Sequence, residues 1–313
     1  MSKVILLMGP LFDATMQQLE ADYTVHRYWE TSDANTLLTS IADDCVGVVT
    51  DGGKGVSNDI LQQLPKAKVV SVFGVGVDAI DLEYCQSQGI QVGNTPDVLS
   101  DDVADLAVAL ALASCRQLVT GDQYARRGDW SSKGAMPLTT RMMGKKAGIF
   151  GMGSIGECLA KRLTGFDMQV SYCNRSQKNN SPYEFVDSLE ALAAQSEFLF
   201  ITAAATSSSV GAVNAKVLDA LGPKGHLINV SRGTLVDEPV LVDYLNAGKI
   251  AGAGLDVFLN EPTIPDALKQ LDNVVLQPHN ASGTWETRKA MGDLMLENLG
   301  CHFNQKPMTA PVV

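Results

Sequence analysis

The decapeptide AGIFGMGSIG, residues 147–156, is the stretch that decides the fold. It consists of a short apolar run that ends in the pattern G-x-G-x-x-G, and residues 157–163 continue with helical spacing. The first glycine permits a tight turn, the second lets the backbone approach a pyrophosphate, and the third lets helix and strand pack closely. Taken alone, the three glycines are also compatible with an ordinary turn between a strand and a helix.

A second predicted strand at 167–173 argues against the ordinary turn, because it completes a strand–helix–strand unit of roughly 30 residues. This is the size of a Rossmann unit, in which the positive end of the helix faces the phosphates of a dinucleotide. The residues predicted to contact the dinucleotide are Gly151, Met152, Gly153, Ser154, Ile155, Gly156, Asn174, Arg175 and Ser176.

The end of the second strand predicts which dinucleotide is used. Rossmann units that bind NAD place an Asp or Glu there for the ribose 2′-hydroxyl, whereas this chain has Asn174, Arg175 and Ser176. An arginine pairs with a 2′-phosphate, and the two polar neighbours donate hydrogen bonds to it. We therefore predict NADPH (NADP⁺) as cofactor in preference to NADH; the alternative is a solvent-facing arginine on a loop.

Length and charge restrict the function further. A chain of 313 residues is expected to form two domains. Its net charge of −11 argues against nucleic acid and anionic membranes as partners, since both require a basic face. An anionic substrate would need local cations or N–H groups to attract it against the overall field.

The six cysteines are scattered and form no C-x-x-C pair. Their apolar surroundings predict buried, reduced thiols and no metal site. No apolar run reaches the roughly 18 to 20 residues of a membrane span, and the N-terminal residues lack a signal-peptide signature. A cytoplasmic protein is expected. The cysteines are Cys45, Cys85, Cys115, Cys158, Cys173 and Cys301.

The first hundred residues alternate apolar strand patterns, at 4–8, 46–50, 69–72 and 90–92, with helical patterns at 11–22, 57–64 and 81–88. This alternation predicts a parallel sheet with helices on both faces. Ligands of such sheets meet loops at the carboxyl ends of strands. The loop 73–78 (FGVGVD) is one of these, and its N–H groups are predicted to bind a carboxylate, with a simple turn as the alternative.

After a break at 94–96, a long apolar helix is predicted from Asp101 towards residue 127, packed either on a second subunit or in the core of one chain. Further strands are predicted at 198–202, 226–230, 251–257 and 274–276, and helices at 188–194, 214–221 and 237–246. Residues 284–303 form a last helix that returns to the first domain. The predicted domains are therefore 1–98 with 283–313, and 99–282.

Three of these strands run into polar residues: the strand at 226–230 into Arg232, the strand at 251–257, which contains Asp256, into Glu261, and the strand at 274–276 into His279. All three strand ends are expected at the edge where the glycine loop lies. A histidine supplies the proton that accompanies hydride transfer to a carbonyl, a carboxylate orients it, and an arginine holds a substrate carboxylate. Taken singly, each of these residues has an ordinary structural role, and only their joint occurrence favours catalysis.

These segments resemble the D-2-hydroxyacid dehydrogenase family, within it most closely the NADPH-dependent glyoxylate/hydroxypyruvate reductases and their hydroxyphenylpyruvate-reducing relatives. The resemblance covers nearly the whole chain and includes FGVGVD at 73–78, NVSRG at 229–233, LDVF at 255–258 and PHNASGT at 278–284. It implies an α/β fold with a Rossmann dinucleotide-binding domain and a flavodoxin-like substrate domain, both with parallel sheets. It also implies reduction of small 2-oxo acids to D-2-hydroxy acids by a homodimer paired through the cofactor domain.

The resemblance implies roles for individual residues. His279 looks like the proton donor, Glu261 its partner, and Arg232 the group that holds the 2-oxo acid; Val75 and Gly76 would bind the substrate carboxylate through N–H groups. Asp256 would face the nicotinamide amide. Further cofactor contacts would come from Val230, Ser231, Arg232, His279 and Ala281, and the pocket would be shaped by Phe73, Met136 and Trp285.

The chain also departs from the family pattern. The loop 199–206 lacks a proline usual in the family, Asn280 replaces an apolar residue, and Asp105 stands where a glutamate is usual. A non-enzymatic alternative remains, because transcriptional corepressors that sense NAD(P) share this fold and keep the catalytic set. The triplet at 174–176, which suits a reductive cofactor, favours the enzyme.

Overall fold

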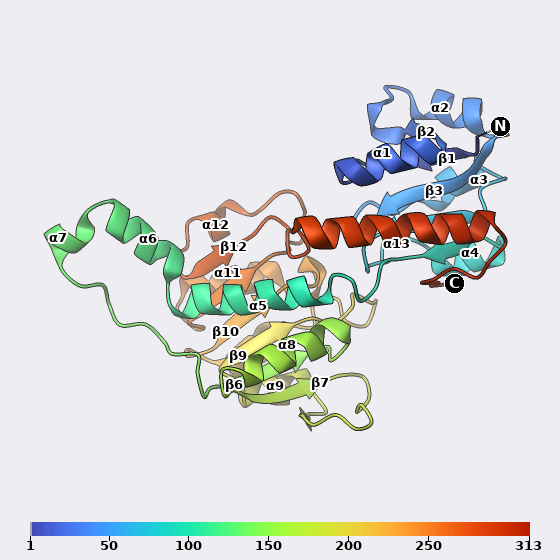
Figure 1. The fold of residues 1–313 in the computed structure, drawn as a ribbon. Helices are drawn as coiled ribbons and strands as arrows, with labels where there is room; N and C mark the ends of the chain where they lie inside the picture. Colours follow the sequence, from blue (N-terminus) through green and yellow to red (C-terminus); the bar gives the residue numbers. More distant parts are fainter. Residues whose placement is uncertain (1) are drawn as a thin grey trace. The chain divides into compact units, whose positions relative to one another are not determined.

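A computed structural model describes residues 2–313. The chain divides into two compact units: residues up to Leu99 together with Gly283–Val313 form unit 1, and Ser100–Ser282 form unit 2 (Figure 1). The domain boundary expected from the sequence, after residue 98, differs from this division by one residue.

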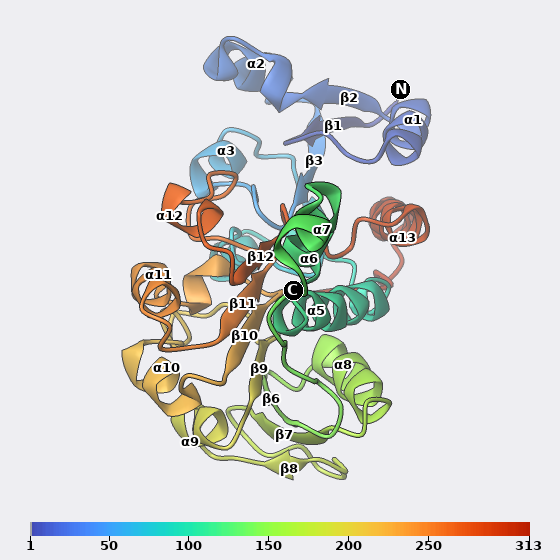
Figure 2. The ribbon, with the colours of Figure 1, turned by 90° about the vertical axis from the view of Figure 1, so that its left-hand side faces the viewer.

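Unit 1 contains a five-stranded parallel sheet with helices on both faces. Its strands are β1 (Val4–Leu7), β2 (Thr24–Arg27), β3 (Cys45–Asp51), β4 (Val69–Phe73) and β5 (Gln91–Gly93). Its helices are α1 (Asp13–Asp22), the 3₁₀ turn η1 (Tyr28–Glu30), α2 (Ala34–Ile41), α3 (Asn58–Gln62), α4 (Leu82–Ser87) and α13 (Trp285–Phe303). Helices α1 and α13 lie on one face, and α2 and α3 lie on the other (Figure 2).

The strand order of this sheet, β2-β1-β3-β4-β5, is the flavodoxin-like order. Strand β4 is buried along its whole length because helices cover both of its sides, which explains its continuous apolar run. The end of the chain completes the unit: the buried Asn298 donates to the carbonyl of Asn94 (3.0 Å) and accepts from Ala310 N–H (3.0 Å). Residues 310–313 thereby bond along the edge strand β5.

Unit 2 contains a seven-stranded sheet. Its strands are β6 (Lys146–Phe150), β7 (Gln169–Cys173), β8 (Glu184–Phe185), β9 (Phe198–Ile201), β10 (His226–Asn229), β11 (Gly252–Leu255) and β12 (Val274–Leu276). Its helices are α5 (Ser100–Cys115), α6 (Leu118–Arg126), α7 (Asp129–Lys133), α8 (Ser154–Thr164), α9 (Leu189–Ala194), α10 (Ala215–Leu221), η2 (Gly233–Leu235), α11 (Glu238–Asn246) and α12 (Asp266–Lys269).

All described strand pairs of this sheet are parallel, and the order is β12-β11-β10-β9-β6-β7-β8. Counted from β6, this is the Rossmann order 3-2-1-4-5-6 with one further strand. Helices α5 and α8 cover one face, and α9, α10 and α11 cover the other (Figure 2). The predicted α/β class with two parallel sheets is therefore confirmed.

The predicted long helix from Asp101 towards residue 127 is wrong in its extent. Helix α5 ends at Cys115 and Gln117 adopts a left-handed conformation (φ 51°), after which α6 and α7 follow as separate helices. The carbonyl of Cys115 accepts a hydrogen bond from Thr140 N–H (3.0 Å), and Arg116 Nε donates to Thr139 Oγ1 (3.0 Å). Contacts with a later segment, rather than a local glycine or proline, accompany this break.

Other differences are smaller. Strand β11 stops at Leu255 instead of residue 257, and the short elements β2, α2, β8 and α12 were not predicted. All six cysteines are free, but Cys158 and Cys301 are only partly buried, which corrects the expectation that every thiol is buried.

Within residues 2–313, no single helix is long and apolar enough to cross a membrane; α5 and α6 pass such a test only as a pair, bent by 58°. No group of three His, Cys, Asp or Glu side chains in this range is arranged to hold a metal ion.

Candidate active site

The glycine loop after β6 has two positions with no room for a side chain and one that is open. Gly151 has φ +105°, and a Cβ there would lie 2.3 Å from the backbone nitrogen of Ala203. A Cβ on Gly156 would lie 2.3 Å from the carbonyl oxygen of Gly151. A Cβ on Gly153 would meet no atom within 4 Å. The loop thus leaves free space at the position where a pyrophosphate approaches the backbone.

Helix α8 begins directly after this space. The N–H groups of Ser154 and Ile155 have no acceptor within the part of the chain that the structure describes. Such groups, together with the helix dipole, make a ready anion site. Asn174 Oδ1 accepts a hydrogen bond from Met152 N–H (2.7 Å), which ties the glycine loop to the end of β7. The Asn174 amide oxygen is therefore engaged, whereas its NH₂ group has no acceptor among residues 2–313 and can donate to a ligand.

The residues after β7 present a cation and no acid. Arg175 and Ser176 are exposed, and Arg175 has no ion-pair or hydrogen-bond partner among residues 2–313. The next cation along the chain, Lys178, already pairs with Glu157. A 2′-phosphate at this strand end would therefore meet an uncommitted guanidinium and no competing carboxylate.

A buried asparagine shapes the turn after β10. Asn229 Nδ2 donates to the carbonyl of Arg232 (2.9 Å), and its Oδ1 accepts from Ser231 N–H (3.1 Å). A Cβ on Gly233 would lie 2.0 Å from the carbonyl carbon of Phe258, so the turn packs directly on the neighbouring loop. Arg232 Nη1 donates to the carbonyl of Ser231 (2.8 Å). Its guanidinium is thereby held beside its own loop at the carboxyl edge of the sheet.

Asp256 connects the ends of β11 and β12. It is fully buried, and its two carboxylate oxygens accept the N–H groups of Asn280 (2.8 Å) and Ala281 (3.0 Å). Its carbonyl accepts the N–H of His279 (2.8 Å). Burial raises the pKa of the Asp256 carboxyl, and the N–H bonds work in the opposite direction. The first role of Asp256 is therefore to position the segment that carries His279.

His279 and Glu261 form a direct pair. The distance from His279 Nδ1 to Glu261 Oε2 is 2.6 Å, and Glu261 Oε1 accepts from Phe258 N–H (2.9 Å). Burial opposes ionisation of Glu261, but the hydrogen bonds from His279 and Phe258 outweigh it and hold the pKa of this carboxyl below its ordinary value. Because Nδ1 donates to a carboxylate, Nε2 is the ring nitrogen left to face a substrate. The imidazole side chain is 42% exposed, so a ligand can reach it.

The loop after β4 in unit 1 offers backbone donors. Thr95 Oγ1 accepts from Gly74 N–H (3.0 Å), and Asn94 Nδ2 donates to the carbonyl of Val75 (2.8 Å), so the loop is held from the β5 side. The N–H groups of Val75 and Gly76 find no acceptor in the described chain. Two adjacent free N–H groups form an anion nest.

The predicted pocket residues lie at different places. Phe73 ends β4, and the Arg288 guanidinium lies 5.7 Å from its ring centre. Trp285 is 78% exposed and packs edge-to-face on Phe12. Met136 lines a cavity beside α6, and none of the predicted catalytic residues lines that cavity.

The other three histidines are placed by ordinary packing. His26 lies in the edge strand β2, and His226 is buried at the start of β10. His302, in the last helix, is partly buried, and its Nδ1 lies 2.7 Å from Gln91 Oε1.

Two positioning residues were not predicted. Asn229 begins the motif NVSRG that contains Arg232. An asparagine just before a predicted turn could therefore have indicated its role in holding that turn. Glu238, in the first turn of α11, is buried and accepts the N–H of Leu259 (3.1 Å) beside the Glu261 loop. An acid in a first helical turn is so common that no sequence signal identified it.

Comparison with known proteins gives a consistent result. The family model described as D-isomer specific 2-hydroxyacid dehydrogenase, NAD binding domain, matches residues 108–281. A hydroxyphenylpyruvate reductase of Plectranthus scutellarioides is 45% identical over 309 residues, which cover 99% of this chain and 98% of that protein. A glyoxylate/hydroxypyruvate reductase A of Arabidopsis thaliana is 41% identical over the same shares of both chains.

A solved structure is similar over the full length. An NADPH-dependent glyoxylate/hydroxypyruvate reductase from Sinorhizobium meliloti, in complex with NADP and malonate, superposes with a TM-score of 0.94 at 38% identity. The match covers 100% of this chain and 97% of that one.

Proposed function

This chain belongs to the D-isomer specific 2-hydroxyacid dehydrogenase family, and from that premise we propose that it is an NADPH-dependent reductase whose proton donor is His279. It is an oxidoreductase that binds an NAD(P) cofactor and reduces 2-oxo acids to 2-hydroxy acids. The observation that carries the proposed role is the pair formed by His279 Nδ1 and Glu261 Oε2 at 2.6 Å.

The residues divide the reaction between them. A bound nicotinamide supplies the hydride to the carbonyl carbon of the 2-oxo acid. His279 gives its Nε2 proton to the carbonyl oxygen, so that the 2-hydroxy acid forms as the histidine becomes neutral. Glu261 stays ionised, fixes the ring and stabilises the charged imidazole before the proton leaves. Arg232 holds the substrate and polarises its carbonyl.

The cofactor side rests on three features of unit 2. The open position at Gly153 and the free N–H groups at the start of α8 suit a pyrophosphate. The Asn174 amide, Arg175 and Ser176 suit a 2′-phosphate, and the strand end carries no acid to bind a 2′-hydroxyl. These features support NADPH over NADH.

The proposed recognition of the substrate rests on the negative charge of its carboxylate. The N–H groups of Val75 and Gly76 would bind the carboxylate shared by all 2-oxo acids. Glyoxylate and hydroxypyruvate, which name two of the similar proteins, are small acids of this class. Hydroxyphenylpyruvate names a third and carries an aryl group, so we include aryl pyruvates among the substrates to be tried.

The experiment is a matrix of steady-state assays on the purified chain. Glyoxylate, hydroxypyruvate, hydroxyphenylpyruvate and pyruvate are each tested with NADPH and with NADH, and kcat/KM is compared. We expect turnover with NADPH at least about 10-fold more efficient than with NADH, from one charge-assisted hydrogen bond. Equal use of both cofactors would contradict the role given to residues 174–176. Binding of NADPH without turnover of any acid would favour a dinucleotide-sensing protein.

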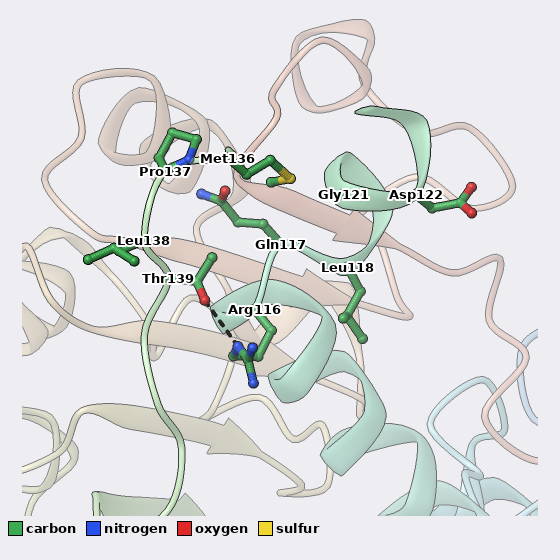
Figure 3. Close-up of a pocket in the computed structure, with 9 residues that line it drawn as sticks. All are labelled: Arg116, Gln117, Leu118, Gly121, Asp122, Met136, Pro137, Leu138 and Thr139. Carbon is green, nitrogen blue, oxygen red and sulfur yellow. Dashed lines mark hydrogen bonds between the residues drawn. The ribbon is translucent and has the colours of Figure 1, made fainter. Parts of the chain in front are cut away.

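We also propose that the chain is a homodimer paired through unit 2. The segment from α6 to residue 143 exposes large apolar side chains, including Trp130 (72% exposed) and Leu138 (100%). Residues 116–118, 121–122 and 136–139 line a cavity of about 390 Å³ there, drawn in Figure 3. Such apolar surface is expected to be covered by another chain. Sedimentation equilibrium of wild type and of Trp130→Asp tests this: a wild-type monomer would contradict the proposal.

A further inference from the structure

Three loops of unit 1 meet at the carboxyl edge of its sheet. They follow β1, β3 and β4, which are neighbours in the strand order. A Cβ on Gly52 would lie 2.7 Å from the carbonyl oxygen of Gly76, so the loop after β3 packs directly on the loop that carries the Val75 and Gly76 donors. The loop that carries Lys54 therefore borders the loop of the proposed carboxylate site.

The backbone of the β3 loop is firmly held. Asp51 Oδ1 accepts the N–H groups of Gly53 (2.9 Å) and Lys54 (2.8 Å), and Thr50 Oγ1 donates to the carbonyl of Gly55 (2.6 Å). Gly55 has φ +58°, and a Cβ there would lie 2.0 Å from the carbonyl oxygen of Ala79. This turn determines where the side chain of Lys54 starts.

The Lys54 side chain then passes over the β1 loop. A Cβ on Gly9 would lie 2.6 Å from Lys54 Nζ and 3.0 Å from its Cδ, so the ammonium occupies the space that a side chain at position 9 would take. Lys54 is exposed, and no carboxylate of residues 2–313 lies within ion-pair distance of it. By contrast, Lys133, Lys145 and Lys289 each pair with a carboxylate.

We propose that Lys54 selects 2-oxo acids that carry a second acidic group, by pairing with the distal carboxylate while the Val75 and Gly76 N–H groups bind the carboxylate next to the carbonyl. This inference rests on the proposed function. The charge of the chain supports it: with a net charge of −11, a dianionic substrate needs a local cation, and Lys54 has no ion-pair partner among residues 2–313. An apolar substituent on the 2-oxo acid would form no ion pair with Lys54.

The experiment compares four acids that differ only in the group attached to the 2-oxo acid: glyoxylate, pyruvate, hydroxypyruvate and oxaloacetate. They are assayed with NADPH in wild type, Lys54→Met, Lys54→Arg and Gly9→Ala. The last variant moves the ammonium without removing it, because only the flexible end of Lys54 must shift. Lys68→Met is the matched control: it removes an exposed lysine that precedes β4, at the opposite edge of the same sheet.

In Lys54→Met we expect kcat/KM for oxaloacetate to fall about 10-fold, mainly through KM, since a remote ion pair binds ground and transition states alike. In the same variant, kcat/KM for glyoxylate and for pyruvate should change by no more than about 2-fold, and kcat/KM for hydroxypyruvate should fall by an intermediate factor. Lys54→Arg should keep most of the preference for the diacid. Gly9→Ala should lose part of the preference for oxaloacetate, and Lys68→Met should lose none of it. An equal loss for all four acids, or no loss for any, would overturn the proposal.

A binding measurement separates this inference from the proposed reaction. Calorimetric titration of the holoenzyme with D-malate and D-lactate compares a diacid with a monoacid, and it needs no turnover. Tighter binding of D-malate that disappears in Lys54→Met supports the role of Lys54 even if no 2-oxo acid is reduced. Equal affinities for the two acids in wild type would overturn it, whatever the assays of reduction show.

Discussion

Two histidines occupy opposite edges of the unit 2 sheet, and their surroundings differ in every respect that matters for proton transfer. His279 follows β12 at the carboxyl edge, where its Nδ1 bonds the Glu261 carboxylate at 2.6 Å. His226 is the first residue of β10 at the amino edge, where its Nδ1 lies 2.9 Å from Ser114 Oγ. One partner is charged and the other is neutral.

Burial separates them further. His226 is 3% exposed, lies against Phe198 with ring centres 5.0 Å apart, and its Nε2 is buried without a partner in residues 2–313. Burial lowers the pKa of His226 to about 4. The comparison teaches that the sheet edge decides what a histidine does: Ser114, near the end of helix α5, and Phe198 lie against His226 at the amino edge, whereas the loops at the carboxyl edge leave His279 accessible and paired with an acid.

The largest expected effect comes from removing the accessible histidine. His279→Ala should lower kcat by ~10²–10⁴ and leave NADPH affinity nearly unchanged, because only proton donation is lost. The matched change, His226→Gln, should leave kcat within about 3-fold of wild type, since general-acid effects do not extend to a buried group on the far edge. Steady-state kinetics and cofactor titration of both variants decide. A His279→Ala enzyme with wild-type turnover would end the assignment of the proton donor.

The buried histidine should instead govern stability at low pH. Its folded pKa is lower than its unfolded value of 6.5, so the unfolded chain binds the extra proton first and stability falls as the pH drops from 6.5 to about 4. The loss should reach roughly 3 kcal/mol over this window. His226→Phe, which keeps the ring beside Phe198, should remove this part of the slope. Urea unfolding at pH 7, 5.5 and 4 measures it, and identical slopes in the two proteins would contradict the explanation.

The choice between NADPH and NADH should depend on residues at the carboxyl edge of the unit 2 sheet and not on residues at its amino edge. Arg175→Ala should weaken NADPH binding by roughly 10- to 100-fold, the value of a charge-assisted hydrogen bond, and should hardly affect NADH. The control is Lys224→Ala, which removes an exposed cation from the loop that precedes β10 at the amino edge. Both variants are compared by kcat/KM for each cofactor. A parallel loss for NADPH and NADH would show that Arg175 does not recognise the 2′-phosphate.

The smallest expected effect is a displaced pH profile. The hydrogen bonds of Glu261 hold its pKa below the ordinary value, so it is ionised throughout the neutral range. Glu261→Gln removes the charge that favours imidazolium, so the alkaline limb of kcat in the direction of reduction should move to lower pH by about one unit. His226→Gln should leave that limb in place. A profile of Glu261→Gln that coincides with wild type would show that the carboxylate only orients the ring.

Much of the fold follows from local patterns. The glycine pattern predicts a tight turn at Gly151 and close helix–strand packing at Gly156, and the structure leaves no room for a side chain at either position. Continuous apolar runs such as β4 identified strands of a parallel sheet, because helices cover both faces of such strands. Polar residues after three of those runs predicted Arg232, Glu261 and His279 as one group, since parallel strands end at one edge.

Local patterns failed where the structure is weakly amphipathic or bent by distant contacts. The edge strand β2 has the mixed sequence TVHR, and its residues are exposed or only partly buried, so no apolar run marks it. The break after Cys115 has no glycine or proline, and the segment around Thr140 that bonds there lies 25 residues further along the chain (140 − 115).

The sequence by itself determined the two parallel sheets, the glycine loop proposed to bind the dinucleotide, the absence of an acid beside Arg175, and the set of polar residues at the strand ends. These depend on the period of apolar residues, on turn chemistry and on spacing, all of which are local. Only the tertiary structure decided which histidine is accessible, that Asp256 is committed to backbone N–H groups of the β12 loop, and that Lys54 has no ion-pair partner among the described residues. Such facts depend on hydrogen bonds and exclusion of water between residues far apart in the chain, and these exist only after the strands have packed.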